Sequence, residues 1–307
     1  MNFIFTVLSM PLITDFSHFL ETKVLKKESG LFCKFGLPII PQIQHGQVCK
    51  LNALSVVMNS LNQFRGMPKP LPLRKNKGEF TYSLRQHAKE KYDSQVGEVY
   101  SAKILASIAK DNGFVNSSIY REDKFANYVA RIISSIGNDE APIIFIDIDK
   151  DGEPTNLSGN REHAAVVAGY FFSKENELCF IVSQWGNYYW MKASDVYMST
   201  SQLSESRAPE VFFKYDIGWH DVYSMKFHPP EIFVKPPSEK RKAKELPPED
   251  GGLKNKILVI HHPSKILNKN SFWSNPHSLT TKESENLLRS DLIRKNIPYS
   301  GSNVGLF

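Results

Sequence analysis

The chain is organised around the stretch Gln42-Ile43-Gln44-His45-Gly46-Gln47-Val48-Cys49-Lys50-Leu51-Asn52-Ala53-Leu54, in which a polar loop runs directly into an apolar segment. Apolar residues then recur at spacings of three and four, namely Leu51, Leu54, Val57, Met58 and Leu61. This period predicts a helix with one buried face that continues to about Phe64. Cys49 therefore lies at or just before the N-terminus of that helix.

The predicted position of Cys49 favours a reactive thiol. Unpaired N–H groups and the helix dipole at a helix N-terminus stabilise negative charge, and the thiolate is the reactive form of cysteine. The alternative is a buried structural cysteine, because free cysteine is among the most buried residue types. A nucleophilic cysteine also needs a base, which is commonly a histidine distant in the sequence.

The composition limits the class of protein. With 307 residues the chain is long enough for one large domain or two modest ones, and its apolar content suits a globular core. Its 3 cysteines do not make a disulfide framework and indicate a reducing compartment. The first residues, Met1 to Thr14, lack the basic start of a secretory signal and are too few to span a membrane, so they predict a first strand or packing segment.

Helical patterns come first along the chain and strand patterns follow. After the Cys49 helix, helices are predicted at Val99–Ala109 and Phe125–Ile136. Apolar runs then predict strands at 142–148, 163–170, 178–183 and 185–191. This order favours an α+β domain in which a helical lobe packs against an antiparallel β-sheet.

The character of the sequence changes near residue 228, where proline pairs bracket the charged run Glu239–Glu245. We therefore expect a catalytic domain over residues 1–227, a Pro/Lys-rich linker or arm over 228–256 and a C-terminal extension over 257–307, partly extended or disordered. One strand, Ile257–Ile260, is predicted within that extension. No nucleic-acid partner is expected, since no aromatic residues accompany the basic run and the net charge of +6 is mild.

His163 is the candidate base for Cys49. It opens an apolar strand directly after the polar loop Ser158–Glu162, so it is held on one side and accessible on the other. The small residues Ala164 and Ala165 leave space beside it. The alternative is an ordinary surface histidine that has found a hydrogen-bond partner.

Three motifs together resemble the papain-like cysteine peptidases. They are Gln…Gly…Cys at a helix start, a distant His-Ala-x-Val-x-x-Gly-Tyr, and an apolar strand that ends in polar-polar-Trp-Gly. The resemblance covers roughly Gln42 to Met191 and looks closest to the peptidase C39-like branch and to cysteine-protease effectors of bacterial pathogens. It implies a papain-like fold with Cys49 as nucleophile and His163 as base. It also implies a glutamine that donates to the oxyanion, for which Gln44 lies near the right position and Gln42 is the alternative.

The third member of the implied triad departs from the family pattern. Papain-like enzymes have Asn-Ser-Trp-Gly where this chain has Ser183-Gln184-Trp185-Gly186. Strict register puts Ser183 at the orienting position, but Gln184 can accept from the imidazole N–H through its amide oxygen, as asparagine does. We therefore predict Gln184 as the orienting residue. The alternatives are Ser183, Asn187, Asp147 and Asp149.

The resemblance implies a cysteine-dependent hydrolase that cleaves a peptide or isopeptide bond through a thioester intermediate. The substrate would be a protein or peptide, with a host protein as one candidate. A bacterial effector would be secreted into the host cytosol, and the protein would otherwise be cytoplasmic. A glutamine deamidase or transglutaminase on the same fold is one alternative, and an inactive protein-binding module is another.

No cofactor or metal is expected. The run Asp147-x-Asp149-x-Asp151-Gly152 matches the first half of a calcium-binding loop, but Ser158 stands where a bidentate glutamate is needed. The cysteines and histidines do not have zinc-ligand spacing, and no phosphate-binding glycine loop is present.

Overall fold

The structure is a computed structural model that describes residues 11–27, 30–31, 33–44, 46, 48–74, 82–92, 94, 97–204, 219–220, 227–228 and 252–263. Six helices are described, α1 (Phe16–Thr22), α2 (Cys49–Arg65), α3 (Leu84–Lys91), α4 (Ala102–Asp111), α5 (Phe125–Gly137) and α6 (Ala193–Ser201). In the part of the chain that the structure describes, no helix is both long and apolar enough to cross a membrane.

Most of the strands join one large sheet. The larger strands are β4 (Cys33–Phe35), β5 (Ser117–Arg121), β6 (Ile143–Ile148), β8 (Glu162–Phe172), β9 (Leu178–Gln184), β10 (Asn187–Lys192) and β13 (Lys256–Ile260). The short strands are β1 (Leu12–Ile13), β2 (Lys26–Lys27), β3 (Gly30–Leu31), β7 (Pro154–Thr155), β11 (Trp219–His220) and β12 (Phe227–His228).

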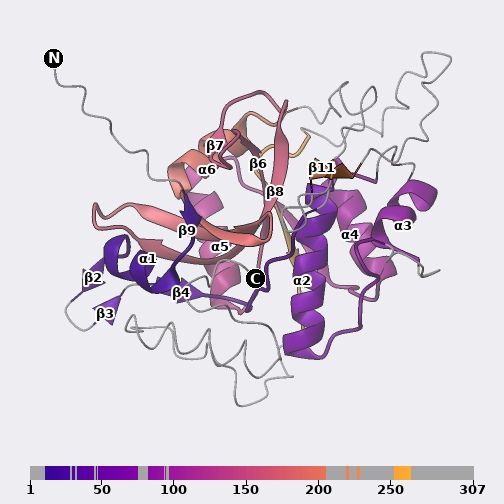
Figure 1. Cartoon of the computed structure of the whole chain (residues 1–307), viewed down its shortest axis with the longest axis horizontal. Coiled ribbons are helices and arrows are strands. Elements are labelled where there is room, and N and C mark those ends of the chain that lie inside the picture. The colour runs from indigo at the N-terminus through magenta and orange to yellow at the C-terminus, as the bar shows by residue number, and fades with distance from the viewer. Residues whose placement is uncertain are drawn as a thin grey trace.

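The large sheet runs in the order β1-β10-β9-β8-β6-β13-β5, with β4 also paired to β8 and β7 to β6, and all its pairings are antiparallel. Two further pairs, β2-β3 and β11-β12, lie outside it. Figure 1 shows α2 beside the strands, with α3 and α4 beyond it. The long strand β8 lies at the centre of these contacts, because it pairs with β6 and β9 and packs against α2.

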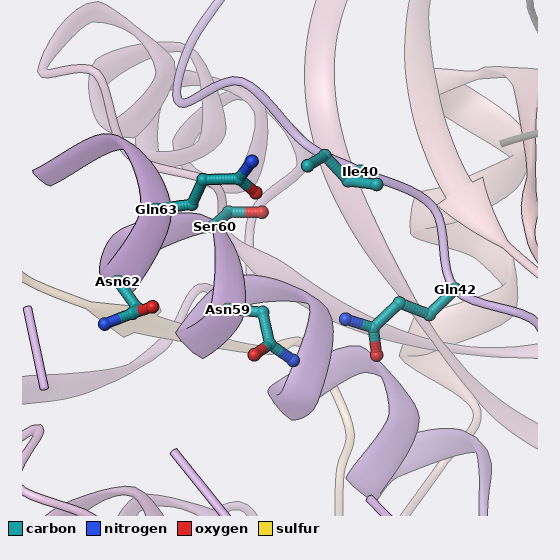
Figure 2. Close-up of a pocket in the computed structure, with 6 residues that line it drawn as sticks. All are labelled: Ile40, Gln42, Asn59, Ser60, Asn62 and Gln63. Carbon is teal, nitrogen blue, oxygen red and sulfur yellow. The ribbon is translucent and has the colours of Figure 1, made fainter. Parts of the chain in front are cut away.

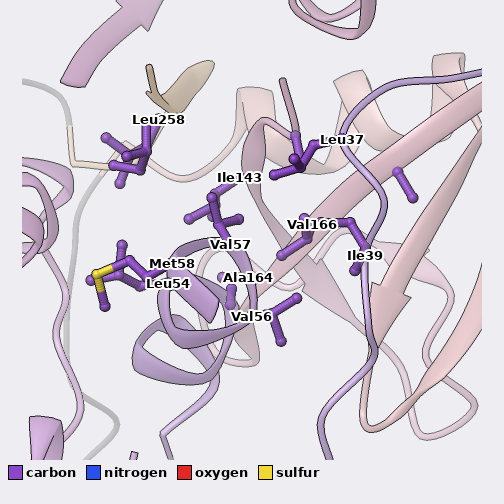
Figure 3. Close-up of a cluster of buried hydrophobic side chains, with 14 of the residues drawn as sticks. Leu37, Ile39, Leu54, Val56, Val57, Met58, Ile143, Ala164, Val166 and Leu258 are labelled. Carbon is purple, nitrogen blue, oxygen red and sulfur yellow. The ribbon is translucent and has the colours of Figure 1, made fainter. Parts of the chain in front are cut away.

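α2 is held by its apolar face, as the spacing of its leucines predicts. The face of Leu51, Leu54 and Leu61 is fully buried, in a cluster that continues into the sheet. Figure 3 shows members of this cluster from α2, from β6, β8 and β13, and from the segment around Leu37. The helix ends at Gly66, whose φ of 65° lies in the left-handed region that glycine adopts without strain.

A second apolar cluster covers the opposite face of the sheet, under α5 and α6. Alternate residues of β8 divide between the two clusters, since Ala164 and Val166 pack with α2 whereas Ala165 and Val167 pack with α5. β8 is buried on both faces, which explains its nearly continuous apolar sequence. From Ala164 to Ala168 the even-numbered residues of β8 face α2, and the register shift between Val167 and Gly169 reverses this, so that Tyr170 lies on the α5 side and Phe171 on the α2 side.

The α+β fold predicted from the sequence, with the Cys49 helix packed against an antiparallel sheet, is confirmed. One element differs from the expected domain plan, because β13 lies between β6 and β5 within the main sheet. Strand Ile257–Ile260, expected in a C-terminal extension, thus completes the same sheet as the region before residue 227. Most of the predicted linker 228–256 and everything after 263 lie outside the described residues.

Candidate active site

Cys49 is the first residue of α2 and is 8% exposed. Val48 precedes it at the N-cap position and supplies no side-chain hydrogen bond to the first turn. The free N–H groups at this end therefore need an acceptor from elsewhere in the chain. Cys49 Sγ donates to Glu98 Oε2 at 3.1 Å and approaches the backbone oxygen of Glu162 at 3.8 Å.

The acceptor for the start of α2 is the Glu98 carboxylate. The Lys50 N–H lies 3.3 Å from each Glu98 oxygen, and the Val99 N–H donates to Glu98 Oε1 at 2.9 Å. The helix dipole favours a negative group at this position. Glu98, which is 5% exposed, thus caps α2 and at the same time accepts the hydrogen of the predicted nucleophile.

Lys50 is a fully buried lysine beside the cysteine. Its Nζ lies 3.0 Å from Glu162 Oε1, 4.0 Å from Cys49 Sγ and 4.2 Å from the centre of the Tyr100 ring. The side chains of Lys50 and Glu162 are 0% and 1% exposed, so their ion pair is shielded from water. A buried lysine tends to lose its charge, and the carboxylate opposes that loss.

These charged groups set the electrostatics of the thiol. Burial raises the pKa of Cys49, Glu98 raises it further, and Lys50 lowers it. Burial alone would lower the pKa of Lys50, but Cys49, Glu162 and Glu98 together raise it well above its ordinary value. Burial raises the pKa of Glu162 as well, although the Lys50 ammonium opposes the shift. At neutral pH the site therefore holds a protonated thiol next to a fixed cation.

His163 directly follows Glu162 in β8, so the predicted base is one residue from the point where Cys49 meets the strand. Glu162 faces Lys50, whereas strand alternation places His163 on the face of Ala165, under α5 and α6. Its ring packs against Trp185, with ring centroids 5.5 Å apart. Within the described residues, no hydrogen bond joins the His163 ring to Cys49 Sγ.

The His163 ring is neutral in this environment. Burial first, and the Lys50 ammonium second, lower its pKa from 6.5 to about 3, whereas an interaction with Gln184 opposes the shift. Gln184 Nε2 donates to the backbone oxygen of Gly152 at 3.0 Å, which fixes the amide. His163 Nε2 and Gln184 Oε1 are both buried without a hydrogen-bond partner among the described atoms. Buried polar atoms nearly always have a hydrogen-bond partner, so two unpaired atoms on neighbouring side chains are unusual.

The two glutamines before Cys49 differ in their contacts. Gln44 Nε2 donates to the backbone oxygen of Gly46 at 2.8 Å, and its Oε1 is buried without a partner. Gln42 Oε1 instead accepts from Ser55 Oγ at 3.1 Å, one turn and a half into α2. Neither amide makes a hydrogen bond to Cys49 among the described contacts. His45, the histidine of this loop, lies outside the described residues.

The alternative orienting residues have other contacts. The Asp147 carboxylate accepts from the N–H groups of Leu157, Gly159 and Arg161 and so holds the loop that leads into β8. Asp149 Oδ1 accepts from two N–H groups of the turn that follows it, those of Asp151 and Glu153. Ser183 pairs with Val166 in the sheet, and Asn187 begins β10 opposite Gln184. Of the five candidates, Gln184 interacts with the His163 ring.

No group of three or more His, Cys, Asp or Glu side chains among the described residues is arranged to hold a metal ion. Two aspartates of the calcium-like run, Asp147 and Asp149, accept hydrogen bonds from backbone N–H groups. A cavity of about 360 Å³ does lie along α2, lined by Ile40, Gln42, Asn59, Ser60, Asn62 and Gln63. Figure 2 shows Gln42 on the loop facing Asn59 on the helix. Asn59 is ten residues along α2 from Cys49, roughly 15 Å at 1.5 Å per residue, so this cavity is separate from the thiol.

Sequence reasoning did not identify Lys50 and Glu98 as residues of this site. Lys50 is the residue after Cys49, and a lysine beside an otherwise apolar helical face would ordinarily be solvated. Glu98 lies in a short segment between α3 and α4 that has no periodicity, so nothing in the sequence connects it with α2. The available signal was the pair Glu162-His163, because a carboxylate directly before the predicted base requires a partner if the strand is buried.

Comparison with known proteins gives limited similarity. A family model described as the actin maturation protease-like C-terminal domain matches residues 39–171, a span that contains Cys49, Glu98 and His163 and ends before Gln184. No curated protein sequence matches the chain. The structure is similar to a bromelain protease from Ananas comosus in complex with the E64 inhibitor at 13% identity and a TM-score of 0.30, over 50% of this chain and 85% of that one. It is similar to a recombinant stem bromelain precursor at 12% identity and a TM-score of 0.28, over 59% and 71% of the two chains.

Proposed function

We propose that the protein is a cysteine-dependent peptidase in which Cys49 is the nucleophile and His163 the base. One observation supports this most directly: Cys49 Sγ, at the start of α2, lies 3.8 Å from the backbone oxygen of Glu162, the residue before His163. The fold thus brings the start of α2 to the strand that carries His163, 114 positions later in the chain. The match of residues 39–171 to a protease-named family is consistent with this proposal.

The proposed reaction follows from the chemistry of the residues. Cys49 Sγ attacks the carbonyl carbon of the scissile bond, its proton passes to His163, and the carbonyl π electrons move onto the oxygen. Collapse of that oxyanion expels the amine, which takes the proton from His163, and water then hydrolyses the thioester. The His163 ring is neutral and can accept a proton, but its pKa of about 3 makes it a weak base in the described state, so the proposal requires that this pKa rise when substrate binds. Because His163 lies on the opposite face of β8 from Glu162, the start of β8 must rearrange for the ring to reach Sγ when substrate binds.

Gln184 and Gln44 have supporting roles in this proposal. Gln184 would orient the His163 ring through its unpaired Oε1, with its Nε2 held by Gly152. Gln44 would turn its Nε2 from the backbone of Gly46 to the oxyanion, which costs one hydrogen bond of 2.8 Å. The predicted role as a bacterial effector in the cytosol of a host cell, and the link to the C39-like branch, rest on the resemblance of sequence motifs alone.

The substrate is proposed to be a protein. The name of the matching family refers to actin maturation, so immature actin is the first protein to test as a substrate. A glutamine deamidase would use the same nucleophile and is separated from a peptidase by mass spectrometry of the product, which shows either a cleaved chain or a gain of about one mass unit.

A second candidate function has one observation in its favour. The Cys49 thiol donates to the Glu98 carboxylate, and its pKa is raised by burial, so the described state is not an activated thiolate. This arrangement is compatible with an inactive protein-binding module that keeps the fold of a peptidase.

An epoxide probe that alkylates thiolates distinguishes the two functions on the full chain. The other free cysteines, Cys33 and Cys179, are buried and serve as internal references in the same sample. The peptidase requires that Cys49 be labelled much faster than both, and that His163→Ala removes the difference. Equal labelling of all three cysteines would exclude the peptidase and favour the binding module.

A further inference from the structure

The start of α2 contains a group that a Cys-His-Gln triad does not need. Lys50 is completely buried, and its ammonium lies 4.0 Å from Cys49 Sγ. Taking a lysine out of water carries a desolvation penalty that its partner repays only when the geometry is good. An ion pair at this depth is weak evidence for stability, so the position of Lys50 calls for a functional reason.

The contacts of Lys50 fix its position relative to the sulfur. Glu162 Oε1 holds Nζ at 3.0 Å, and the Tyr100 ring lies on the cation at 4.2 Å. The pair also has a geometric consequence, because Lys50 follows Cys49 and Glu162 precedes His163 in the chain. The Lys50–Glu162 ion pair therefore joins the neighbour of the proposed nucleophile to the neighbour of the proposed base.

His163 does not provide the positive charge that such a thiol would need. Its ring makes no hydrogen bond to Cys49 among the described contacts, and burial keeps it neutral at neutral pH. Lys50 is the cation closest to the sulfur in the contacts that the structure describes. The charged or titratable groups that face Cys49 and Lys50 are Glu98, Tyr100 and Glu162, and the Lys50 ammonium also acts through space on His163, on the other face of β8.

We propose that Lys50 is a catalytic residue of the Cys49 site, the fixed cation that stabilises the thiolate, and that Glu98 opposes it by holding the thiol hydrogen. This inference rests on the proposed function, since it concerns the reactivity of Cys49. The two carboxylates have different roles in it. Glu162 keeps the ammonium charged and in position, whereas Glu98 accepts from Sγ at 3.1 Å and from the Lys50 N–H.

The direction of each substitution follows from these contacts. Lys50→Met removes the cation while keeping most of the side-chain volume, so it lowers the thiolate fraction. An opposite charge within about 4–6 Å shifts a pKa by roughly 1–3 units, and the greater nucleophilicity of the less acidic thiol offsets about half of that. Alkylation of Cys49 at pH 7 should therefore fall about 3- to 30-fold. Glu98→Gln keeps an acceptor but removes the charge, so alkylation should rise by a similar factor.

The test is the rate of alkylation by iodoacetamide across pH, measured on the full chain by mass spectrometry of each cysteine peptide. In this reaction the Sγ–C bond forms, the C–I bond breaks, iodide leaves, and the thiol proton passes to solvent. In Lys50→Met the rate of Cys49 alkylation should begin to rise at a higher pH than in the parent. In Lys50→Arg the dependence of this rate on pH should resemble that of the parent. The buried Cys33, at 3% exposure, stays unlabelled in any variant that is folded.

Arg65→Met is the matched control. It removes a cation from the other end of the same helix, where Arg65 Nη2 lies 3.1 Å from Asp139 Oδ2, and should leave the alkylation of Cys49 unchanged. If Lys50→Met does not fold, the double variant Lys50→Met/Glu162→Gln removes both charges of the pair and should show the same slow alkylation.

The outcomes separate the two proposals. If Cys49 of the parent reacts no faster than Cys33 and Cys179, the proposed function fails. If the parent reacts rapidly and the folded Lys50 variants stay within twofold of it, the peptidase stands and the role of Lys50 is overturned. An equal loss of alkylation rate in Arg65→Met would also overturn the role of Lys50, because the effect would then belong to α2 in general. Slower alkylation of Cys49 in Glu98→Gln would overturn the proposed role of Glu98.

Discussion

The two ends of α2 are built in different ways. At the C-terminal end Gly66 adopts a left-handed conformation and donates its N–H to Leu61, and Arg65 pairs with a partly exposed Asp139. At the N-terminal end there is no side-chain cap from Val48, and charged groups that are almost fully buried replace it. The C-terminal end thus uses a glycine cap and an ion pair whose carboxylate reaches water, although Arg65 Nε is buried without a hydrogen-bond partner among the described atoms.

The N-terminal end is costly by comparison. Its ion pair of Lys50 and Glu162 is desolvated, and His163 Nε2 and Gln184 Oε1 nearby have no hydrogen-bond partner among the described atoms. Perturbed and desolvated groups gather at functional sites more often than elsewhere. The difference fits the proposal that the N-terminal end of α2 carries the chemistry while the C-terminal end stabilises the helix, and each prediction below tests one side of that division.

The largest effect is expected from Cys49→Ala. It should lower turnover of a protein substrate at least about 1,000-fold, or about 4 kcal/mol of transition-state stabilisation, since the nucleophile is lost. Stability should change little, because Glu98 keeps the N–H groups of Lys50 and Val99 as donors. Asn59→Ala, at the cavity near the other end of α2, should leave turnover within twofold of the parent. Turnover by Cys49→Ala within tenfold of the parent would contradict the assignment of Cys49 as nucleophile and of the N-terminal end of α2 as the catalytic end.

The next effect concerns stability. Glu162→Ala leaves the Lys50 ammonium buried without its carboxylate, and breaking such a pair costs roughly 3–5 kcal/mol. Arg65→Met should cost about 1 kcal/mol or less, because Asp139 is 22% exposed and can be hydrated. Urea unfolding of both variants measures the difference. Similar losses at the two ends would mean that burial of the Lys50 pair has no special energetic weight.

Acid should also act on the N-terminal end. The folded-state pKa of His163 is lowered to about 3 from 6.5, so the unfolded chain binds one more proton between these values. The stability contribution of neutral His163 is complete above pH 6.5 and is lost as pH falls toward 3. At pH 4 the loss should be roughly 3 kcal/mol. Glutamine does not titrate, so the urea midpoint of His163→Gln should change less than that of the parent between pH 7 and pH 4.

The sequence predicted the fold well where periodicity was strong. The Cys49 helix was expected to end near Phe64 and ends at Arg65, and the strand expected at 163–170 is the centre of β8, Glu162–Phe172. Both segments are buried along a regular face, so local pattern and tertiary packing agree. The position of β13 was not predictable, because a short apolar strand after a long proline-rich stretch carries no information on which sheet it joins.

Prediction of the site was limited in a different way. The patterns of the sequence predicted the helix that Cys49 begins and the strand that carries His163, but only the resemblance to papain-like peptidases predicted that the two would meet. The contacts of Lys50 and Glu98 depend on side chains from three separate segments, and no periodicity connects those segments. Strand alternation also determines that His163 and Glu162 lie on opposite faces, a consequence that appears only when the neighbours of β8 are known.

A smaller effect is expected from Gln184→Ala. If Gln184 orients the His163 ring, its loss should lower kcat about 10- to 100-fold while KM changes little, the usual cost of an orienting partner. Ser183→Ala should be nearly silent, which separates the two candidates. Asp147→Asn should act on stability instead, because Asp147 holds three backbone N–H groups of the loop before β8. A silent Gln184→Ala with a large loss of kcat in Ser183→Ala would reverse the assignment.

The smallest effect tests the C-terminal end of α2. Gly66 has a φ of 65°, and a Cβ added there would meet nothing within 4 Å. The cost of Gly66→Ala is therefore that of the left-handed backbone alone, about 1 kcal/mol, with no clash to add.

Gly137, the last residue of α5, does not have a left-handed φ, and a Cβ there would make only an ordinary contact with Lys34 Nζ at 3.7 Å. Gly137→Ala should thus stabilise by about 0.4–1 kcal/mol, because it reduces the freedom of the unfolded chain. Thermal unfolding should show a loss of stability for Gly66→Ala and a gain for Gly137→Ala. With unchanged labelling of Cys49 in both variants, this result would support a purely structural role for this end of α2. Slower labelling of Cys49 in Gly66→Ala would instead connect the two ends.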